Sequence, residues 1–197
     1  MEVIEKFFNI MKEELEKQKQ LKQQYKATGL NLYFVYELVE CSYKKVLREK
    51  YPDLEKANIY NPRFVIGKMI EEIIRNYFGG NKIVKQKSVD NDIILAGAAD
   101  IVKDNKIIEV KYQTALVDVP LKHHVLQLQL YLWLFEFSKG ELLYISPEGI
   151  RAIEVEKQID LQDVLALIKQ EKIPRWPEWE CSYCIFNQLC PYSVKKK

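Results

Sequence analysis

Two acidic residues and a lysine near the middle of the chain have the types and spacing of a hydrolytic metal site. A two-residue turn at 104–105 would place Asp100 directly opposite Glu109 on paired strands, with Lys111 two residues further along the same face. Carboxylates about 4.5 to 5.5 Å apart repel each other, and a cation would relieve that repulsion. Two such ligands for Mg²⁺ or Mn²⁺ beside an ammonium group suit phosphodiester hydrolysis. A solvated, salt-bridged sheet face is the plainer interpretation of the same residues.

Four cysteines form a second chemically informative group. Cys181, Cys184 and Cys190 follow a C-x2-C-x5-C spacing, and Cys41 lies far upstream. A shared site would therefore join the N-terminal region to the tail. Four thiolates bind either Zn²⁺ or an iron–sulfur cluster, and the spacing alone leaves both open. Four buried, apolar cysteines are a third interpretation.

The segments that carry these residues predict an α/β fold. The expected helical or amphipathic segments cover residues 1–26, 30–49, 64–78, 121–137 and 160–172. The expected strands cover residues 82–89, 93–102, 106–113, 142–145 and 150–155. Gly79 is expected to end the third helical segment, which should pack on a core, and Asp160 to cap the last one. The tail from Pro174 onward reads as irregular.

The composition limits the classes of protein. The chain has 197 residues, of which 48% are hydrophobic and 29% charged, so we expect one folded domain with additions rather than a fibrous or disordered protein. A net charge of +2 means that nucleic acid would need a local basic surface. The most apolar stretch, 125–137, is too short to span a bilayer. The N-terminus lacks the pattern of a signal peptide, so we expect a cytoplasmic protein without membrane contact.

Three motifs in order resemble those of the PD-(D/E)xK nuclease superfamily, in its RecB-like branch. They are Gly97-Ala98-Ala99-Asp100, Glu109-Val110-Lys111 and Gln127-Leu128-Gln129-Leu130-Tyr131. The resemblance implies a core with a mixed central sheet flanked by helices. It also implies that Asp100, Glu109 and the backbone carbonyl of Val110 bind the metal and that Lys111 is catalytic. Gln127 and Tyr131, on one helix face, would contact DNA.

One position departs from that family. Relatives carry a histidine ligand in a Gly-x-x-x-His pattern on an earlier helix, whereas this chain has Gly67 followed by Glu71. A carboxylate suits a hard cation, so Glu71 is a candidate ligand for Mg²⁺ or Mn²⁺, with an ordinary exposed helix residue as the alternative. For His123 and His124 we favour a surface or structural role.

The cysteines extend the resemblance beyond the core. One distant N-terminal cysteine with C-x2-C-x5-C at the other end is similar to the 4Fe-4S arrangement of RecB-like nucleases in which the cluster staples the tail to the N-terminal helices. The size of the chain is similar to that of the small stand-alone exonucleases of CRISPR systems. Such a protein divides into an N-terminal helical region at 1–62 that carries Cys41, a nuclease core at 63–172 and a cluster-binding tail at 173–197.

That family implies a function and two rivals. Its members typically cut single-stranded DNA with Mg²⁺ or Mn²⁺, often from the 5′ end, and work with the CRISPR integrase proteins. The rivals are a non-catalytic adaptor that binds DNA or the integrase complex, and a zinc-stapled DNA-binding protein; self-association stays open. Trp176 and Trp179 are expected to pack the tail. Candidate basic contacts for the strand are Lys44, Lys45, Arg48, Lys82, Lys85, Lys87, Lys122, Lys195, Lys196 and Lys197.

Overall fold

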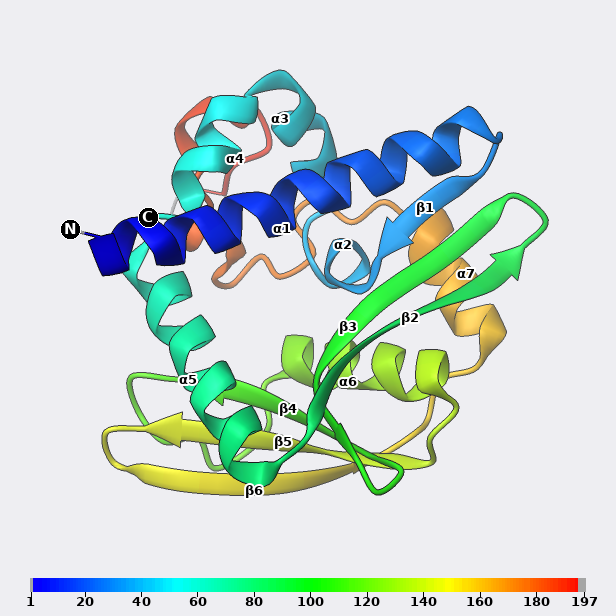
Figure 1. The fold of residues 1–197 in the computed structure, drawn as a ribbon. Coiled ribbons are helices and arrows are strands. Elements are labelled where there is room, and N and C mark those ends of the chain that lie inside the picture. Colours follow the sequence, from blue (N-terminus) through cyan, green and yellow to red (C-terminus); the bar gives the residue numbers. More distant parts are fainter. Residues whose placement is uncertain (1, 195–197) are drawn as a thin grey trace.

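A computed structural model describes residues 2–194 of the chain (Figure 1). Its α-helices are α1 (Glu2–Ala27), α2 (Val35–Val39), α3 (Lys44–Lys50), α4 (Pro52–Asn58), α5 (Pro62–Phe78), α6 (Lys122–Phe135) and α7 (Leu161–Lys169). Its strands are β1 (Asn31–Phe34), β2 (Asn81–Asp90), β3 (Ile93–Lys103), β4 (Lys106–Tyr112), β5 (Lys139–Ser146) and β6 (Gly149–Glu156). The tail carries two 3₁₀ turns, η1 (Glu180–Tyr183) and η2 (Asn187–Leu189).

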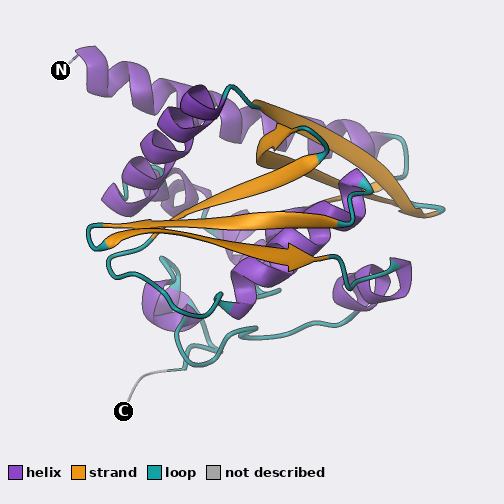
Figure 2. Ribbon diagram, turned by 90° about the horizontal axis from the view of Figure 1, so that it is seen from below, coloured by secondary structure: helices purple, strands orange, loops and turns teal. Residues whose placement is uncertain are grey.

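The strands form one mixed sheet, which confirms the predicted fold class. Its order is β1-β3-β4-β5-β6, and β2 pairs with β3 away from this path. The pairs β1–β3 and β4–β5 are parallel, and the others are antiparallel. Helices lie on both sides of the sheet in Figure 2. Leu142 packs in the cluster that contains α6, whereas Leu143 packs with Ile70 and Ile74 of α5, so α5 and α6 cover opposite faces.

The predicted turn between β3 and β4 is confirmed. Asp104 and Asn105 have φ values of 49° and 58°, which is the left-handed pair that a two-residue hairpin turn requires. Lys103 consequently pairs with Lys106, and the register continues to Ile101 opposite Ile108. The paired register ends there, and Asp100 and Glu109 are the next residues on the two strands.

A β-bulge in β3 interrupts the regular alternation at Asp100. Ile83 pairs with Ala99 and Asn81 pairs with Val102, so β3 contains one residue more than β2 over this interval. In a regular strand Ala99 and Ile101 would face the same side, but here they pack in the clusters on opposite faces. Bulges re-aim side chains next to functional sites, and this one turns the strand where the predicted metal ligand lies.

The N-terminal region departs from the prediction in one respect. The segment 30–49 is not one amphipathic helix, because residues 31–34 form β1, which pairs in parallel with β3. The side chains of β1 alternate, and Leu32 and Phe34 are buried against Ala96. Helix then resumes in α2 and α3, with Cys41 in the break between them. The mostly helical region 1–62 thus also supplies an edge strand to the sheet.

Helix α5 packs less completely than expected. Ile70 and Ile74 contact the sheet, but Met69, Ile73 and Tyr77 of the same helix are exposed, and none of its residues is fully buried. Gly79 ends the helix in the left-handed conformation, and Asp160 caps α7, both as predicted. Within residues 2–194, no helix is both long and apolar enough to cross a membrane.

Candidate active site and cysteine centre

Adjacent strands bring Asp100, Glu109 and Lys111 together as predicted. Asp100 Oδ2 accepts a hydrogen bond from the backbone N–H of Val110 at 2.9 Å. The ammonium of Lys111 lies 2.9 Å from Glu109 Oε1 and donates to Gln127 Oε1 at 2.8 Å. The strand period explains why Lys111 and Glu109 share a face, and α6 supplies Gln127 from the layer above that face.

One carboxylate oxygen of Glu109 has no partner in the part of the chain that the structure describes, although the other is paired with Lys111. Its side chain is almost completely buried, and Oε2 has no hydrogen-bond partner among the described residues. A buried carboxylate oxygen without a partner is costly, because it has lost its hydration. The oxygen is therefore suited to coordinate a cation, and the residues present fit a Mg²⁺ or Mn²⁺ ion.

The local electrostatics indicate an excess of negative charge. Burial raises the pKa of Asp100 well above its ordinary value, and the neighbouring charges of Glu109 and Glu71 raise it further. Burial acts to lower the pKa of Lys111, but Glu109 and Asp100 outweigh it and raise that pKa. On the paired strands one ammonium thus faces the two carboxylates of Asp100 and Glu109, and a divalent cation would balance the remaining charge.

Glu71 lies near this site but is held by cations. Its carboxylate is 2.9 Å from Arg75 Nη1, 3.3 Å from Lys68 Nζ and 3.7 Å from Lys82 Nζ. It is near enough to influence the pKa of Asp100. In the described part of the chain, no three His, Cys, Asp or Glu side chains are already gathered as ligands of one ion. Glu71 would have to exchange ammonium or guanidinium partners for a metal.

Gln127 and Tyr131 lie on the same side of α6 as predicted, but they differ in their surroundings. Gln127 accepts the hydrogen bond from Lys111. Tyr131 is only 6% exposed, and burial raises the pKa of its phenol well above the ordinary value. Gln127 therefore borders the site, whereas the ring of Tyr131 packs behind it.

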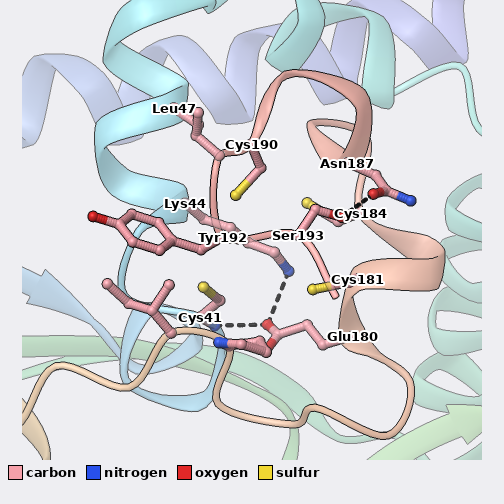
Figure 3. A pocket seen from close by; sticks show the side chains of 12 residues that line it. Cys41, Lys44, Leu47, Glu180, Cys181, Cys184, Asn187, Cys190, Tyr192 and Ser193 are labelled. Carbon is pink, nitrogen blue, oxygen red and sulfur yellow. Dashed lines mark hydrogen bonds and ion pairs between the residues drawn. The ribbon is translucent and has the colours of Figure 1, made fainter. Parts of the chain in front are cut away.

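The four cysteines are all free thiols that line one pocket (Figure 3). Their sulfur atoms face a common space in Figure 3, although Cys41 comes from the segment after α2 and the other three come from the tail. Burial raises the pKa of Cys41 and of Cys184. The four thiols line one pocket, but no three of them are gathered as ligands of one ion among the described residues, so a tetrathiolate centre would require their side chains to draw together as the metal replaces the thiol protons.

Glu180 ties the two cysteine-bearing segments together. Its carboxylate is buried and accepts backbone N–H groups from Cys41 at 2.6 Å, Arg175 at 3.0 Å and Trp176 at 3.2 Å. The ammonium of Lys44 lies 3.1 Å away. Burial acts to lower the pKa of Lys44, but nearby acidic groups including Glu180 raise it. The sequence prediction missed this role; the only signal was an acidic residue directly before a cysteine in an aromatic tail.

The two histidines have the structural role that the sequence favours. His124 is buried, with Nδ1 3.0 Å from the hydroxyl of Tyr144. His123 packs against the ring of Trp179 at 4.5 Å. Trp176 donates from Nε1 to the carbonyl of Val39 at 2.7 Å, so both tryptophans pack the tail as expected.

Five of the seven predicted DNA-binding cations that the structure describes are already paired with acids. Lys82 pairs with Glu14 and Glu71, and Lys85 and Lys87 both pair with Glu136. Lys44 and Arg48 pair with Glu40. Lys45 and Lys122 form no salt bridge among the described residues, and Lys195, Lys196 and Lys197 lie outside them.

Comparison with known proteins agrees with this geometry. The model of the PD-(D/E)XK nuclease superfamily matches residues 3–191. The CRISPR-associated exonuclease Cas4 of Saccharolobus solfataricus is 30% identical, over 82% of this chain and 88% of that protein. The crystal structure of SSO0001 has a TM-score of 0.75 and 27% sequence identity, and the match covers 91% of this chain and 98% of that one. A family match across nearly all of the chain, with an acidic pair and a lysine on adjacent strands, leads to one conclusion: the chain belongs to the PD-(D/E)XK nuclease superfamily.

Proposed function

We propose that this nuclease is an exonuclease that cuts single-stranded DNA from the 5′ end with Mg²⁺ or Mn²⁺. The observation that carries the proposal is the buried Glu109 Oε2, which has no hydrogen-bond partner among the described residues and lies near Asp100, whose pKa is raised by burial and by the charge of Glu109. Similarity to a CRISPR-associated exonuclease supports the assignment as an exonuclease. A cytoplasmic role beside the CRISPR integrase proteins belongs to the same proposal.

The side chains divide the work of hydrolysis. Asp100, Glu109 and the carbonyl of Val110 would hold the cation, with Glu71 as a further ligand. When bound, the cation supplies charge neutralisation and an activated water at the phosphate. Lys111 is aimed by Glu109 and Gln127, so its ammonium is held ready for the charge that develops on the phosphate. Gln127 would line the path of the strand, and the buried Tyr131 would support it from behind.

A cleavage assay tests the proposal directly. Single strands labelled at the 5′ or the 3′ end are incubated with Mn²⁺, with Mg²⁺ or with chelator. In further strands, either the 5′ end or the 3′ end is blocked. We expect metal-dependent products that a blocked 5′ end prevents. Asp100→Asn and Glu109→Gln should each lower the rate at least about 100-fold. Asp104→Asn, in the exposed turn of the same hairpin, serves as the control with near wild-type activity. Full activity of Glu109→Gln would overturn the proposal.

We also propose that Cys41, Cys181, Cys184 and Cys190 bind one 4Fe-4S cluster. The support is the convergence of four free thiols from segments far apart in the chain. Anaerobically purified protein should be brown and contain about four iron and four sulfide per chain. Cys41→Ala should remove the colour. If the protein is colourless and contains one zinc ion, the cluster proposal is wrong and the four cysteines form a tetrathiolate zinc site.

Partnership with the integrase proteins has its own test. Purified integrase proteins from the same CRISPR system are mixed with this chain and separated by size-exclusion chromatography. Co-elution at micromolar concentration is the expected result. Separate elution with and without DNA would remove this part of the proposal and leave the nuclease assignment intact.

A further inference from the structure

A second cavity, away from the acidic site, lies among the N-terminal elements. It has a volume of about 480 Å³ and is bordered by α1, β1, α2, α3 and the start of α4. These elements occupy the upper half of Figure 1. None of the residues assigned above to the metal or cysteine sites lines it. The volume lies in the range of cavities that hold one small ligand.

The walls of this cavity carry a surplus of positive charge. Five cationic and three acidic side chains line it. Two of the acids are neutralised, because Glu37 pairs with Lys22, and Glu55 lies 3.2 Å from Lys19. Lys26 and Lys45 form no salt bridge among the described residues. Arg48 is held by Glu40 and Glu55, so Lys26 and Lys45 are the two cations left to meet an anionic ligand, against one acid of the lining, Glu49, that forms no salt bridge in the described part of the chain.

Aromatic rings line the same cavity beside these cations. Tyr33, Phe34 and Tyr36 contribute to the wall, and the rings of Phe34 and Tyr36 stack at 5.7 Å with an interplanar angle of 7°. The ammonium of Lys45 lies 5.3 Å from the ring centre of Tyr33. Aromatic faces next to unpaired ammonium groups are the combination that holds the bases and phosphates of a single strand.

The sheet connects this cavity to the acidic site. Phe34 of β1 pairs with Ala96 of β3, and Asp100 follows four residues later on β3. At about 3.3 Å per residue, Ala96 lies at most about 13 Å from Asp100 along β3, and the bulge shortens this distance. That upper limit corresponds to about four nucleotides at a stacked spacing of 3.4 Å.

We propose that this cavity binds one nucleotide of the single strand whose scissile phosphate lies at Asp100 and Glu109. The proposal rests on the proposed function, because it takes single-stranded DNA as the substrate. The base would lie against the ring of Tyr33, and its phosphate would be bound by Lys26 and Lys45. The cavity is thus a holding site up to about four nucleotides away from the cut.

Binding to a cleavage-deficient protein tests this inference without relying on catalysis. In the Asp100→Asn background, the affinity for a fluorescent 12-nucleotide single strand is measured by anisotropy in chelator and 150 mM salt. The test variant is Lys26→Glu with Lys45→Glu. The control is Lys17→Glu with Lys50→Glu, which makes the same charge change on α1 and α3 at residues that do not line the cavity. We expect Kd to rise at least about tenfold for the test variant and less than about twofold for the control.

Crosslinking measures which nucleotide contacts the cavity, and a general loss of positive charge does not change that position. Strands with 5-iodouracil at successive positions are irradiated on the Asp100→Asn protein, and the adducts are mapped by mass spectrometry. A crosslink to Tyr33 from one or two neighbouring positions only is the expected result. Equal weakening by the test and control variants, or no adduct on the cavity wall, overturns the holding site. Cleavage by the wild-type protein would still stand, so the two proposals fail separately.

Discussion

At the scale of single residues, the surroundings of Glu71 are compatible with two roles, a metal ligand or a partner of nearby cations. Three cations hold its carboxylate, yet its charge reaches Asp100. As a metal ligand, it would contribute one oxygen to an ion held mainly by Asp100 and Glu109. We expect Glu71→Ala to weaken Mn²⁺ binding about tenfold and to lower cleavage in parallel, because one ligand is lost. Isothermal titration calorimetry and the cleavage assay measure the two effects.

Two further variants make the Glu71 prediction specific. Glu71→His should restore part of both metal affinity and activity, because imidazole is also a ligand. Glu72→Ala is the matched control, since Glu72 is the next residue on α5 and lies 3.8 Å from Arg75. If Glu71→Ala binds Mn²⁺ like the wild type, Glu71 is only the partner of Lys68, Arg75 and Lys82.

The acidic site could be predicted from local sequence, and other contacts could not. A two-residue turn fixes the register of the hairpin, so Asp100, Glu109 and Lys111 could be placed together by counting along two strands. The bulge at Asp100 depends on pairing with β2, and no residue near it signals an extra position. Glu180 depends on a contact 139 residues away, which no local pattern encodes.

At the scale of elements, Gly97 sets how closely α6 and α2 approach β3. A Cβ atom at this position would lie 2.7 Å from Cε1 of Tyr131 and 2.8 Å from Cγ2 of Val35. Gly97→Ala should therefore force these elements apart and lower the free energy of unfolding by about 1 to 3 kcal/mol. Urea denaturation provides the measurement.

Gly67→Ala is the natural control for this prediction. Gly67 lies within α5, and a Cβ atom there would meet nothing within 4 Å. Gly67→Ala should raise the free energy of unfolding by about 0.5 to 1 kcal/mol, because alanine loses less backbone entropy than glycine when a helix forms. Equal effects of both substitutions would show that close packing at Gly97 is not what limits the approach of α6.

Elements with strong periodicity were predictable, and those fixed by distant pairing were not. The β3–β4 and β5–β6 hairpins follow from alternating residues and turn signals. The short strand β1 was not recognised, because four residues of alternation between two helices carry little signal and the partner, β3, lies about 60 residues away. Parallel pairing between strands far apart in the chain cannot be predicted from local sequence patterns.

The buried carboxylate of Glu180 attaches the tail to the rest of the protein, and a single substitution tests this role. Glu180→Gln keeps the size of the side chain but removes the charge that Lys44 and three backbone N–H groups share. We expect the free energy of unfolding to fall by about 1.5 to 3 kcal/mol. Protection of the Cys41 amide from hydrogen exchange should fall with it. Glu178→Gln, at an exposed position two residues earlier, should change neither quantity.

At the scale of the whole molecule, the two histidines make stability depend on pH. Burial lowers the pKa of His123 to about 4 and that of His124 to about 2, both below the ordinary value of 6.5. The unfolded chain therefore binds more protons below pH 6.5. The contribution of both residues to stability is complete above that pH and is lost as the pH falls toward 4 and below.

Urea unfolding between pH 7 and 4.5 measures this dependence. His123→Phe with His124→Gln removes both titrating rings, so its free energy of unfolding should fall less steeply across this window than that of the wild type. The ring in His123→Phe keeps a stacking partner for Trp179. Parallel slopes for the two proteins would assign the acid sensitivity to carboxylates instead.

The contact between Glu180 and Cys41 also sets an order of events during synthesis. The segment that carries Cys41 leaves the ribosome long before its partners, which are 139 residues further along the chain. At about 5 to 20 residues per second, it waits roughly 7 to 28 s for Glu180 to be made. During that interval β1 can already pair with β3, while the Cys41 thiol has none of the three other cysteines beside it. Closure of the cysteine pocket is therefore a late step of biogenesis, and a nascent chain stalled before residue 180 would present Cys41 to solvent and to thiol-reactive labels.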